Sequence, residues 1–216
     1  MRGGNSYLEA YELLYEHFGP QDWWPGETPL EVMVGAVLTQ NTNWINVTKA
    51  IDNLDKDGML GYPQLIDMPV DRLAEYIQPS GYYNLKAKRL HNLLMMIENL
   101  YDGDLDCFFK DDMMSARENL LGVKGVGPET ADSILLYACG HPVFVIDSYT
   151  HRVFSRHNLV EEETDYYTMQ TTFMDHLPGD VQIFSEFHAL IVLVAKKFCK
   201  KTNPLCDQCP LSGLNE

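Results

Sequence analysis

The stretch SARENLLGVKGVGPETADSILLYAC, residues 115–139, decides the fold of this chain. Ser115 and Glu118 have the spacing of a capping box, which predicts a short helix. The following GVKGVG sequence, Gly122–Gly127, predicts a tight turn, and Pro128 is suited to the first position of a second helix. The buried face of that second helix is predicted at Ala131, Ile134, Leu135 and Ala138.

The glycines of this turn predict a backbone surface that can meet a phosphate group. Gly125 and Gly127 have no Cβ and therefore tolerate positive φ. Backbone N–H groups at the N-terminus of the next helix can bind a phosphate oxygen, and Lys124 adds charge beside them. A glycine-rich turn by itself is often only a turn. The complete helix–turn–helix frame instead predicts a hairpin that contacts the DNA backbone through Lys124, Gly125, Val126 and Gly127.

Helical periodicity also dominates the rest of the chain, which predicts an all-α fold. Thr28 and Glu31 have the spacing of a second capping box. The single strand-like run, Val143–Ile146, is too short to found a sheet. We expect two helical domains with a cleft between them. A central six-helix domain would span residues 29–140 and end in the hairpin, and a second domain would combine residues 1–28 and 141–216.

The charge of the chain gives a mixed indication about its partner. The formal net charge is −15, which argues against nucleic acid because phosphate binding depends on Lys and Arg. The basic residues are clustered, however, so a local basic strip remains compatible with DNA. No apolar run approaches the roughly 18 residues of a membrane span, and the N-terminus lacks the apolar stretch of a signal peptide. We therefore expect a cytoplasmic, monomeric protein without a membrane partner.

Several blocks of the sequence resemble the endonuclease III (HhH-GPD) superfamily of DNA glycosylases. GVKGVGPETA (122–131) followed by Val145-Ile-Asp147 is similar to its helix-hairpin-helix and Asp motif, and GAVLTQNT (35–42) and GYYNLKAK (81–88) are similar to two earlier blocks. Within the superfamily the chain most resembles the bacterial 3-methyladenine DNA glycosylase III group, through Trp23-Trp24-Pro25 and Pro79–Leu90. The resemblance covers nearly the whole chain. It implies an endonuclease III-type fold and base excision from double-stranded DNA that contains a damaged base.

The resemblance assigns catalysis to Asp147. Breaking the N-glycosidic bond leaves positive charge on the sugar, which a carboxylate stabilises while helping to activate water. A plain helix cap is the alternative role for this Asp. Bifunctional lyases of the family carry a Lys that forms a Schiff base where this chain has Glu129, so we expect a monofunctional enzyme. Adenine glycosylases carry a Glu where this chain has Ala36, which argues against that activity.

The resemblance also implies where DNA and the flipped base bind. A damaged base must leave the stack, and Gln40 or Asn41 is placed to fill the gap. Aromatic rings favour a cationic alkylated purine by roughly 0.5–2 kcal/mol per contact, although tryptophans can equally belong to a core. The predicted base pocket consists of Trp23, Trp24, Pro25, Trp44, Glu129 and Lys196. The further predicted DNA contacts are Lys86 and Arg152.

Three cysteines near the C-terminus match part of a metal-binding motif. Cys199, Cys206 and Cys209 occupy three of the four positions of the family's iron–sulfur loop, C-x6-C-x2-C-x5-C, and Asn215 stands at the fourth. A [4Fe-4S] cluster normally takes four thiolates. The sequence therefore leaves open a cluster completed by another ligand or by solvent, a vestigial site, or a zinc ion.

Three functions fit these observations. The first is a monofunctional glycosylase for an alkylated purine such as 3-methyladenine. The second is a related glycosylase for a mismatch or an oxidised pyrimidine, the latter disfavoured because Ser148-Tyr149 replaces the Thr-His of endonuclease III. The third is a catalytically inactive hairpin protein that binds DNA, which would have no need of the carboxylate at Asp147.

Overall fold

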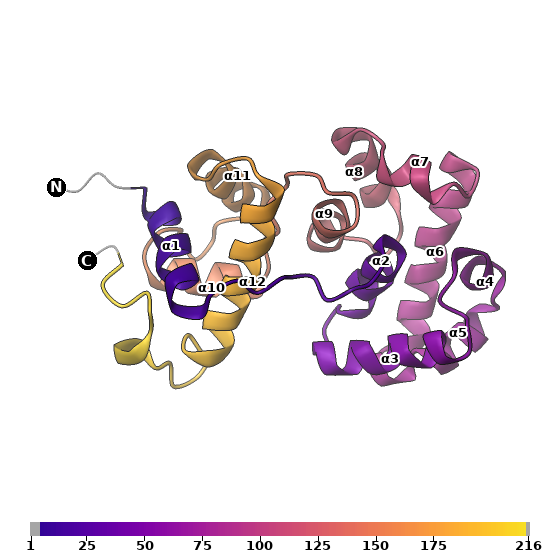
Figure 1. The fold of residues 1–216 in the computed structure, drawn as a ribbon, viewed down its shortest axis with the longest axis horizontal. Coiled ribbons are helices and arrows are strands. Elements are labelled where there is room, and N and C mark those ends of the chain that lie inside the picture. The colour runs from indigo at the N-terminus through magenta and orange to yellow at the C-terminus, as the bar shows by residue number, and fades with distance from the viewer. Residues whose placement is uncertain (1–4, 215–216) are drawn as a thin grey trace. The chain divides into compact units, whose positions relative to one another are not determined.

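The computed structural model describes residues 5–214, and all regular secondary structure in this range is helical, which confirms the predicted all-α fold. No helix in the described range is long and apolar enough to cross a bilayer. The chain forms two compact units (Figure 1). The central unit spans Pro25–His141, and the N/C unit combines the segment up to Trp24 with the segment from Pro142 onward.

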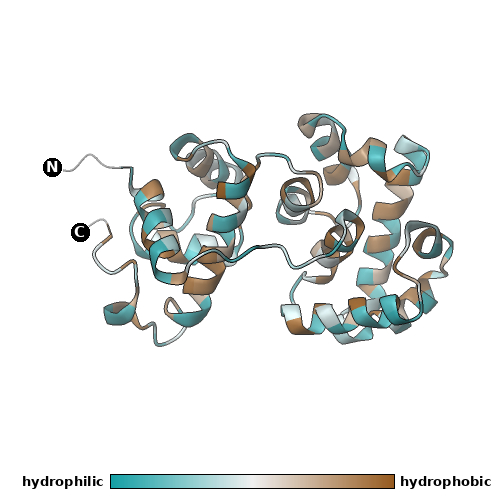
Figure 2. Ribbon diagram, viewed as in Figure 1, coloured by the Kyte–Doolittle hydropathy of each residue, from teal (hydrophilic) through white to brown (hydrophobic). Residues whose placement is uncertain are grey.

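The central unit is built around a helix that is buried on nearly all sides. In α2 (Pro29–Leu38), every residue from Val32 to Leu38 is buried, and the helix packs against α3, α6 and α9. The helices of this unit after α2 are α3 (Trp44–Lys56), α4 (Tyr62–Asp67), α5 (Val70–Tyr76), η1 (Gln78–Ser80), α6 (Tyr83–Tyr101), α7 (Leu105–Phe109), α8 (Met113–Gly122) and α9 (Pro128–Tyr137). This unit, which is fully described, has eight α-helices, more than the six predicted, and its short α4, α5 and α7 lie where the sequence shows no helical period. Figure 2 shows hydrophilic and hydrophobic residues alternating along α3 and α6, as in amphipathic helices.

Two predicted capping boxes have different outcomes. The prediction at Thr28 is confirmed for the cap, because its Oγ1 accepts a hydrogen bond from the Glu31 backbone N at 3.2 Å. The second bond of the box is displaced by one residue, since Oε2 of Glu31 accepts from the backbone N of Glu27 at 3.1 Å. The prediction at Ser115 is wrong. Asp112 caps α8 instead, and its Oδ1 accepts bonds from the backbone N atoms of Met114 and Ser115 at 3.0 and 3.3 Å. A carboxylate three residues earlier thus starts this helix before the predicted cap.

The N/C unit is built around α12 (Val181–Lys197), which is buried continuously from Phe184 to Val192. The helices α1 (Ser6–Phe18) and α10 (Ser148–Arg156) pack against it. An aromatic core fills the unit, in which the Phe144 and Phe173 rings stack with centroids 4.5 Å apart. The remaining helices of the unit are α11 (Tyr166–His176) and η2 (Cys206–Gln208).

Candidate active site

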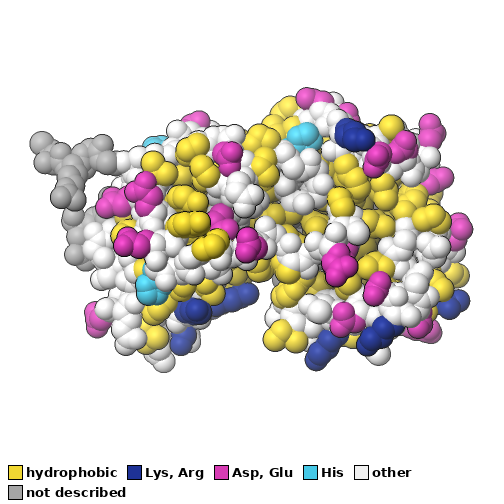
Figure 3. Space-filling view, viewed as in Figure 1, with side chains coloured by type: hydrophobic (Ala, Val, Ile, Leu, Met, Phe, Trp, Pro, Cys, Tyr) yellow, Lys and Arg dark blue, Asp and Glu magenta, His cyan; other side chains and the backbone are white. Residues whose placement is uncertain are grey.

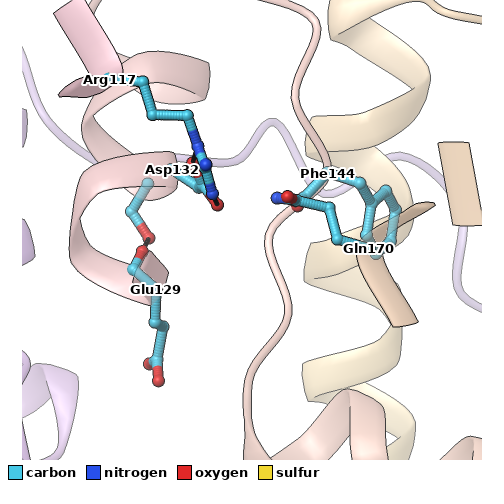
Figure 4. Close-up of polar contacts among 6 residues, drawn as sticks. Arg117, Glu129, Asp132, Phe144 and Gln170 are labelled. Atoms are coloured by element: carbon cyan, nitrogen blue, oxygen red, sulfur yellow. Dashed lines mark hydrogen bonds and ion pairs between the residues drawn. The ribbon is translucent and has the colours of Figure 1, made fainter. Parts of the chain in front are cut away.

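The segment that leads to Asp147 is held rigidly in the core of the N/C unit. Residues 143–146 are buried and belong to no helix or strand. The side chain of Gln170, from α11, donates a hydrogen bond from Nε2 to the carbonyl oxygen of Phe144 at 2.7 Å (Figure 4). A buried polar bond and the aromatic stack therefore fix the backbone just before Asp147, which is the kind of support that a catalytic group requires.

Asp147 caps α10 with one of its two carboxylate oxygens. Oδ1 accepts hydrogen bonds from the backbone N of Thr150 at 2.7 Å and from the Thr150 hydroxyl at 2.9 Å. Oδ2 takes no part in the cap and lies 3.6 Å from Nε2 of His188, which α12 carries. The side chain of Asp147 keeps 11% of its surface exposed. The capping role that the sequence left open is thus present, and it occupies only Oδ1.

The surroundings of Asp147 favour its charged form. Burial acts to raise the pKa of this carboxyl, but the contacts with His188 and Thr150 outweigh burial, so the pKa lies below its ordinary value. The side chain is therefore ionised at neutral pH. An ionised carboxylate in a largely buried position can stabilise a neighbouring positive charge more strongly than it could in water.

The predicted hairpin is present in the central unit as α8, a tight turn and α9. Gly125 has a φ of 104°, and a Cβ at this position would lie 2.3 Å from Cγ of Arg89. Gly125 therefore meets both a backbone and a steric requirement for glycine. Gly127 makes no use of this freedom, because its φ is −101°. Gly127 instead serves as the N-cap residue of α9, where it leaves the helix N-terminus without a side-chain cap.

The predicted backbone contacts on the turn differ in how accessible they are. The side chain of Lys124 is exposed, and its carbonyl oxygen accepts a hydrogen bond from Asn92 at 3.0 Å. Val126 is 7% exposed, so its side chain belongs to the core. A phosphate would therefore contact the side chain of Lys124 and the backbone N–H groups of the other turn residues.

Gln40 joins the loop after α2 to the hairpin. Its Nε2 donates to the carbonyl oxygen of Gly125 at 3.1 Å and to Oγ1 of Thr130 at 3.0 Å. Its Oε1 accepts a short hydrogen bond from Nη1 of Arg89. The predicted gap-filling residue is thus engaged inside the central unit. Its neighbour Asn41 is exposed and has a φ of 55°, so Asn41 is the more accessible of the two candidates.

A buried ion pair ties the two hairpin helices together. Nε of Arg117, on α8, lies 2.7 Å from Oδ1 of Asp132, on α9, and Nη2 of Arg117 lies 2.9 Å from Oδ2. The Asp132 side chain is completely buried and that of Arg117 is 17% exposed. Figure 4 shows these two side chains meeting, while Glu129 on the same helix points away from Asp132. The two-pronged geometry fixes the relative positions of α8 and α9.

The prediction that Lys86 contacts DNA is contradicted. Lys86 is 1% exposed, and its Nζ donates to the carbonyl oxygens of Leu38 at 2.8 Å and Ser80 at 2.7 Å. Burial, with a smaller contribution from Arg89, lowers the pKa of Lys86 to about 8. Lys86 therefore donates a hydrogen bond to a carbonyl oxygen at the C-terminal end of α2, and its ammonium group is too deeply buried to contact a phosphate.

The residues predicted to form the base pocket belong to different units. Trp23 and Trp24 are half-buried in the N/C unit, where their rings meet edge to face with centroids 5.7 Å apart. Pro25 is exposed at the start of the central unit, and Trp44 is half-buried as the first residue of α3. Glu129 is exposed in the first turn of α9.

Lys196 and Arg152 flank one aromatic ring of the N/C unit. Nζ of Lys196, which is exposed, lies 5.6 Å from the centre of the Tyr149 ring, and the Arg152 guanidinium lies 5.1 Å from it. Nε of Arg152 also donates to the carbonyl oxygen of Cys199 at 2.9 Å. Arg152 thus supports the end of α12, a structural role that the sequence did not predict.

The cysteine loop does not fit a four-thiolate cluster. Cys199 is buried and its Sγ accepts a contact from Nη1 of Arg156 at 3.4 Å, whereas Cys206 is exposed and Cys209 is half-buried. Across residues 5–214, no three His, Cys, Asp or Glu side chains are grouped in a way that could hold a metal ion. Asn215, at the fourth motif position, lies outside the described residues. Within the described chain, Arg156 stabilises the loop by donating to the carbonyl oxygens of Lys200 and Lys201 at 2.7 and 3.1 Å.

On the face drawn in Figure 3, acidic side chains are scattered over both units, while Lys and Arg side chains are few. This distribution agrees with the negative formal charge. Lys124, a predicted DNA contact, is exposed, and so are Lys196, Lys197, Lys200 and Lys201 at and after the end of α12, so local groups of cations accompany the acidic surface.

Comparison with known proteins gives consistent matches. The family model for HhH-GPD superfamily base excision DNA repair proteins matches residues 34–178. A candidate DNA repair glycosylase of Methanocaldococcus jannaschii is 46% identical over 94% of this chain and 92% of its own length. A thymine-DNA glycosylase of Aeropyrum pernix is 29% identical over 93% of this chain and 88% of its own length. The crystal structure of the Helicobacter pylori 3-methyladenine DNA glycosylase bound to 1,N6-ethenoadenine is 31% identical, with a TM-score of 0.77 over 89% of this chain and 97% of that one.

Proposed function

The chain belongs to the HhH-GPD superfamily of base excision DNA repair proteins, and we propose that it is a monofunctional DNA glycosylase for an alkylated purine such as 3-methyladenine. Membership of this family makes it a DNA glycosylase of base excision repair. The substrate and the absence of lyase activity are the parts that we propose. Its macromolecular partner is duplex DNA with a damaged base.

The state of Asp147 carries the proposal. One oxygen is engaged by the start of α10 and the other is left for chemistry, in a group whose pKa lies below its ordinary value. A carboxylate serving only as a helix cap needs neither the burial nor the core scaffold that holds residues 143–146. An inactive DNA-binding protein is therefore the weaker explanation.

The proposed reaction uses Asp147 as a fixed negative charge and as a proton acceptor. The bond between the sugar C1′ and the base nitrogen breaks, and its electron pair leaves with the base. The ionised carboxylate stabilises the cationic sugar that remains. A water oxygen then bonds to C1′, and its proton passes to Oδ2 and on to solvent. A purine alkylated to a cation departs as a neutral base, so it requires less help in leaving than an unmodified purine.

Two observations support an alkylated purine as the substrate. The chain is 31% identical to the H. pylori 3-methyladenine DNA glycosylase over most of both chains. The half-buried Trp23, Trp24 and Trp44 offer electron-rich rings, which attract cationic bases. The 29% identity to a thymine-DNA glycosylase supports a second candidate, excision of a mismatched thymine or uracil.

The substrate proposal predicts which base the protein releases. Incubation with duplex DNA treated with a methylating agent should release 3-methyladenine, identified by mass spectrometry of the free bases. Parallel duplexes with a T:G or U:G mismatch should release far less. Release of thymine or uracil without methylated purines would favour the second candidate and overturn the first.

The carboxylate at position 129, where the bifunctional relatives carry an amine, predicts that no Schiff base forms. Glu129 stands on the first turn of α9 and cannot form an imine. Lys86, whose pKa is lowered to about 8, is buried and donates to two carbonyl oxygens. Borohydride should therefore trap no covalent complex between the protein and DNA that contains an abasic site.

The variant Glu129→Lys provides the matched control for this experiment. It places an amine on the exposed first turn of α9 and should yield a detectable trapped complex on a denaturing gel. Efficient trapping by the unaltered protein would show that another amine reaches the sugar, and would contradict the monofunctional assignment.

A further inference from the structure

His188 is the side chain beside the uncapped oxygen of Asp147. Its Nε2 lies 3.6 Å from Oδ2, whereas Oδ1 is taken by the two hydrogen bonds from Thr150. His188 is carried by α12, the core helix of the N/C unit, and α12 packs directly against α10. The imidazole therefore reaches the carboxylate from a different helix than the one that Asp147 caps.

The position of His188 is well defined by burial. Its side chain is 8% exposed, and its neighbours along α12, Phe187 and Ala189, are buried. An ionised carboxylate offers only acceptors, so this contact is favourable when Nε2 carries a proton. The 3.6 Å separation is longer than a hydrogen bond, and catalytic contacts of this kind shorten when substrate binds.

We infer that His188 is a positioning residue for base excision, whose Nε2–H holds Oδ2 of Asp147 directed at C1′ of the flipped nucleotide. The inference rests on the proposed role of Asp147. His188 acts through the carboxylate and touches neither the sugar nor the base. Its loss should therefore slow base release without weakening the binding of DNA.

Two substitutions separate this role from simple packing. His188→Phe keeps an aromatic ring of similar shape but removes the donor, whereas His188→Gln loses the ring and keeps an amide N–H near the position of Nε2. If His188 serves only in packing, the Phe variant should release the base faster than the Gln variant. If His188 positions Asp147, the Gln variant should be the faster of the two. We expect His188→Phe to slow single-turnover base release from methylated duplex DNA about 10–100-fold, the loss typical of a hydrogen bond to a charged group, while His188→Gln retains most of the rate.

Binding and a second histidine provide the controls. The Kd for a duplex that contains a tetrahydrofuran abasic-site analogue should be unchanged in both variants. His157→Phe makes the same substitution at the C-terminal end of α10, roughly 15 Å along the helix from Asp147, and should leave the rate unchanged. If His188→Phe does not fold, the base-release rates of His188→Asn and His188→Gln are compared instead. The Asn variant should be the slower, because its shorter amide cannot reach Oδ2.

The outcomes distinguish this inference from the proposed function. Wild-type rates in His188→Phe, or a higher rate in Phe than in Gln, would overturn the positioning role while Asp147 remained catalytic. Undiminished base release by Asp147→Asn would instead remove the proposed function itself, and the role of His188 with it.

Discussion

Replacing Asp147 with Asn is expected to lower the rate of base release at least about 100-fold, because the substitution removes the negative charge that faces the cationic sugar. Asn retains a carbonyl oxygen that can still accept the two hydrogen bonds from Thr150, so α10 should keep its cap. The loss should therefore appear in single-turnover release from methylated duplex DNA. The Kd for a duplex with a tetrahydrofuran site should stay close to that of the unaltered protein.

A second N-cap aspartate in the same unit provides the matched control. Asp165 caps α11 and accepts hydrogen bonds from the backbone N atoms of Tyr167 and Thr168 at 2.9 and 3.2 Å. Asp165→Asn makes the same chemical change at another helix start and should leave base release unaltered. Equal rates in the Asp147→Asn, Asp165→Asn and unaltered proteins would refute a catalytic role for Asp147.

The parts of the fold that the sequence predicted are those with a strong local signal. The GVKGVG turn, Gly122–Gly127, predicts a hairpin because glycine permits the positive φ of a tight turn and the following proline has the fixed φ of a helix start. The long helices show apolar periodicity over several turns. The short helices α4, α5 and α7 have between five and seven residues, too few to display a helical period, and they were missed for that reason.

The burial of Lys86 could have been predicted from spacing. Lys86 precedes Leu90, Leu93, Leu94 and Ile97 at the intervals of one helix face, and all of these residues are buried on α6. The positive charge of Lys86 and the family resemblance instead favoured a contact between Lys86 and DNA. The partner carbonyls, at Leu38 and Ser80, come from two other segments, and that arrangement is visible only in three dimensions.

The supports of the candidate site could not be predicted, because they join residues far apart in the chain. His188 lies on a helix that is buried along most of its length, so periodicity does not show which residue faces Asp147. Gln40 was assigned to DNA by resemblance, yet its partners Arg89 and Gly125 belong to α6 and the hairpin turn. The family resemblance assigns the candidate catalytic carboxylate, whereas tertiary packing selects the groups that contact it.

Replacing Asp132 with Asn is expected to destabilise the protein by about 3 kcal/mol, because the change removes one partner of a buried ion pair. Asn fits the same space, but its amide N–H atoms would face the guanidinium donors of Arg117, which is only 17% exposed. The free energies of unfolding of Asp132→Asn and of the unaltered protein, measured by urea denaturation, test this prediction.

The exposed pair of Asp106 and Lys110 provides the control, since its atoms lie 3.1 Å apart but its side chains are 80% and 77% exposed. Asp106→Asn should scarcely change the stability, because solvent screens such pairs. A similar effect of the two substitutions would show that the contact between Arg117 and Asp132 contributes no more than a surface pair.

The double variant Arg117→Met/Asp132→Leu separates charge burial from packing at this position. Two apolar side chains leave no unpaired charge, so the double variant should recover much of the stability that Asp132→Asn loses. Its affinity for a duplex with a tetrahydrofuran site should recover less, because the two-pronged contact that fixes α8 against α9 is gone. Full recovery of both properties would mean that packing alone sets the geometry of the Gly122–Gly127 turn.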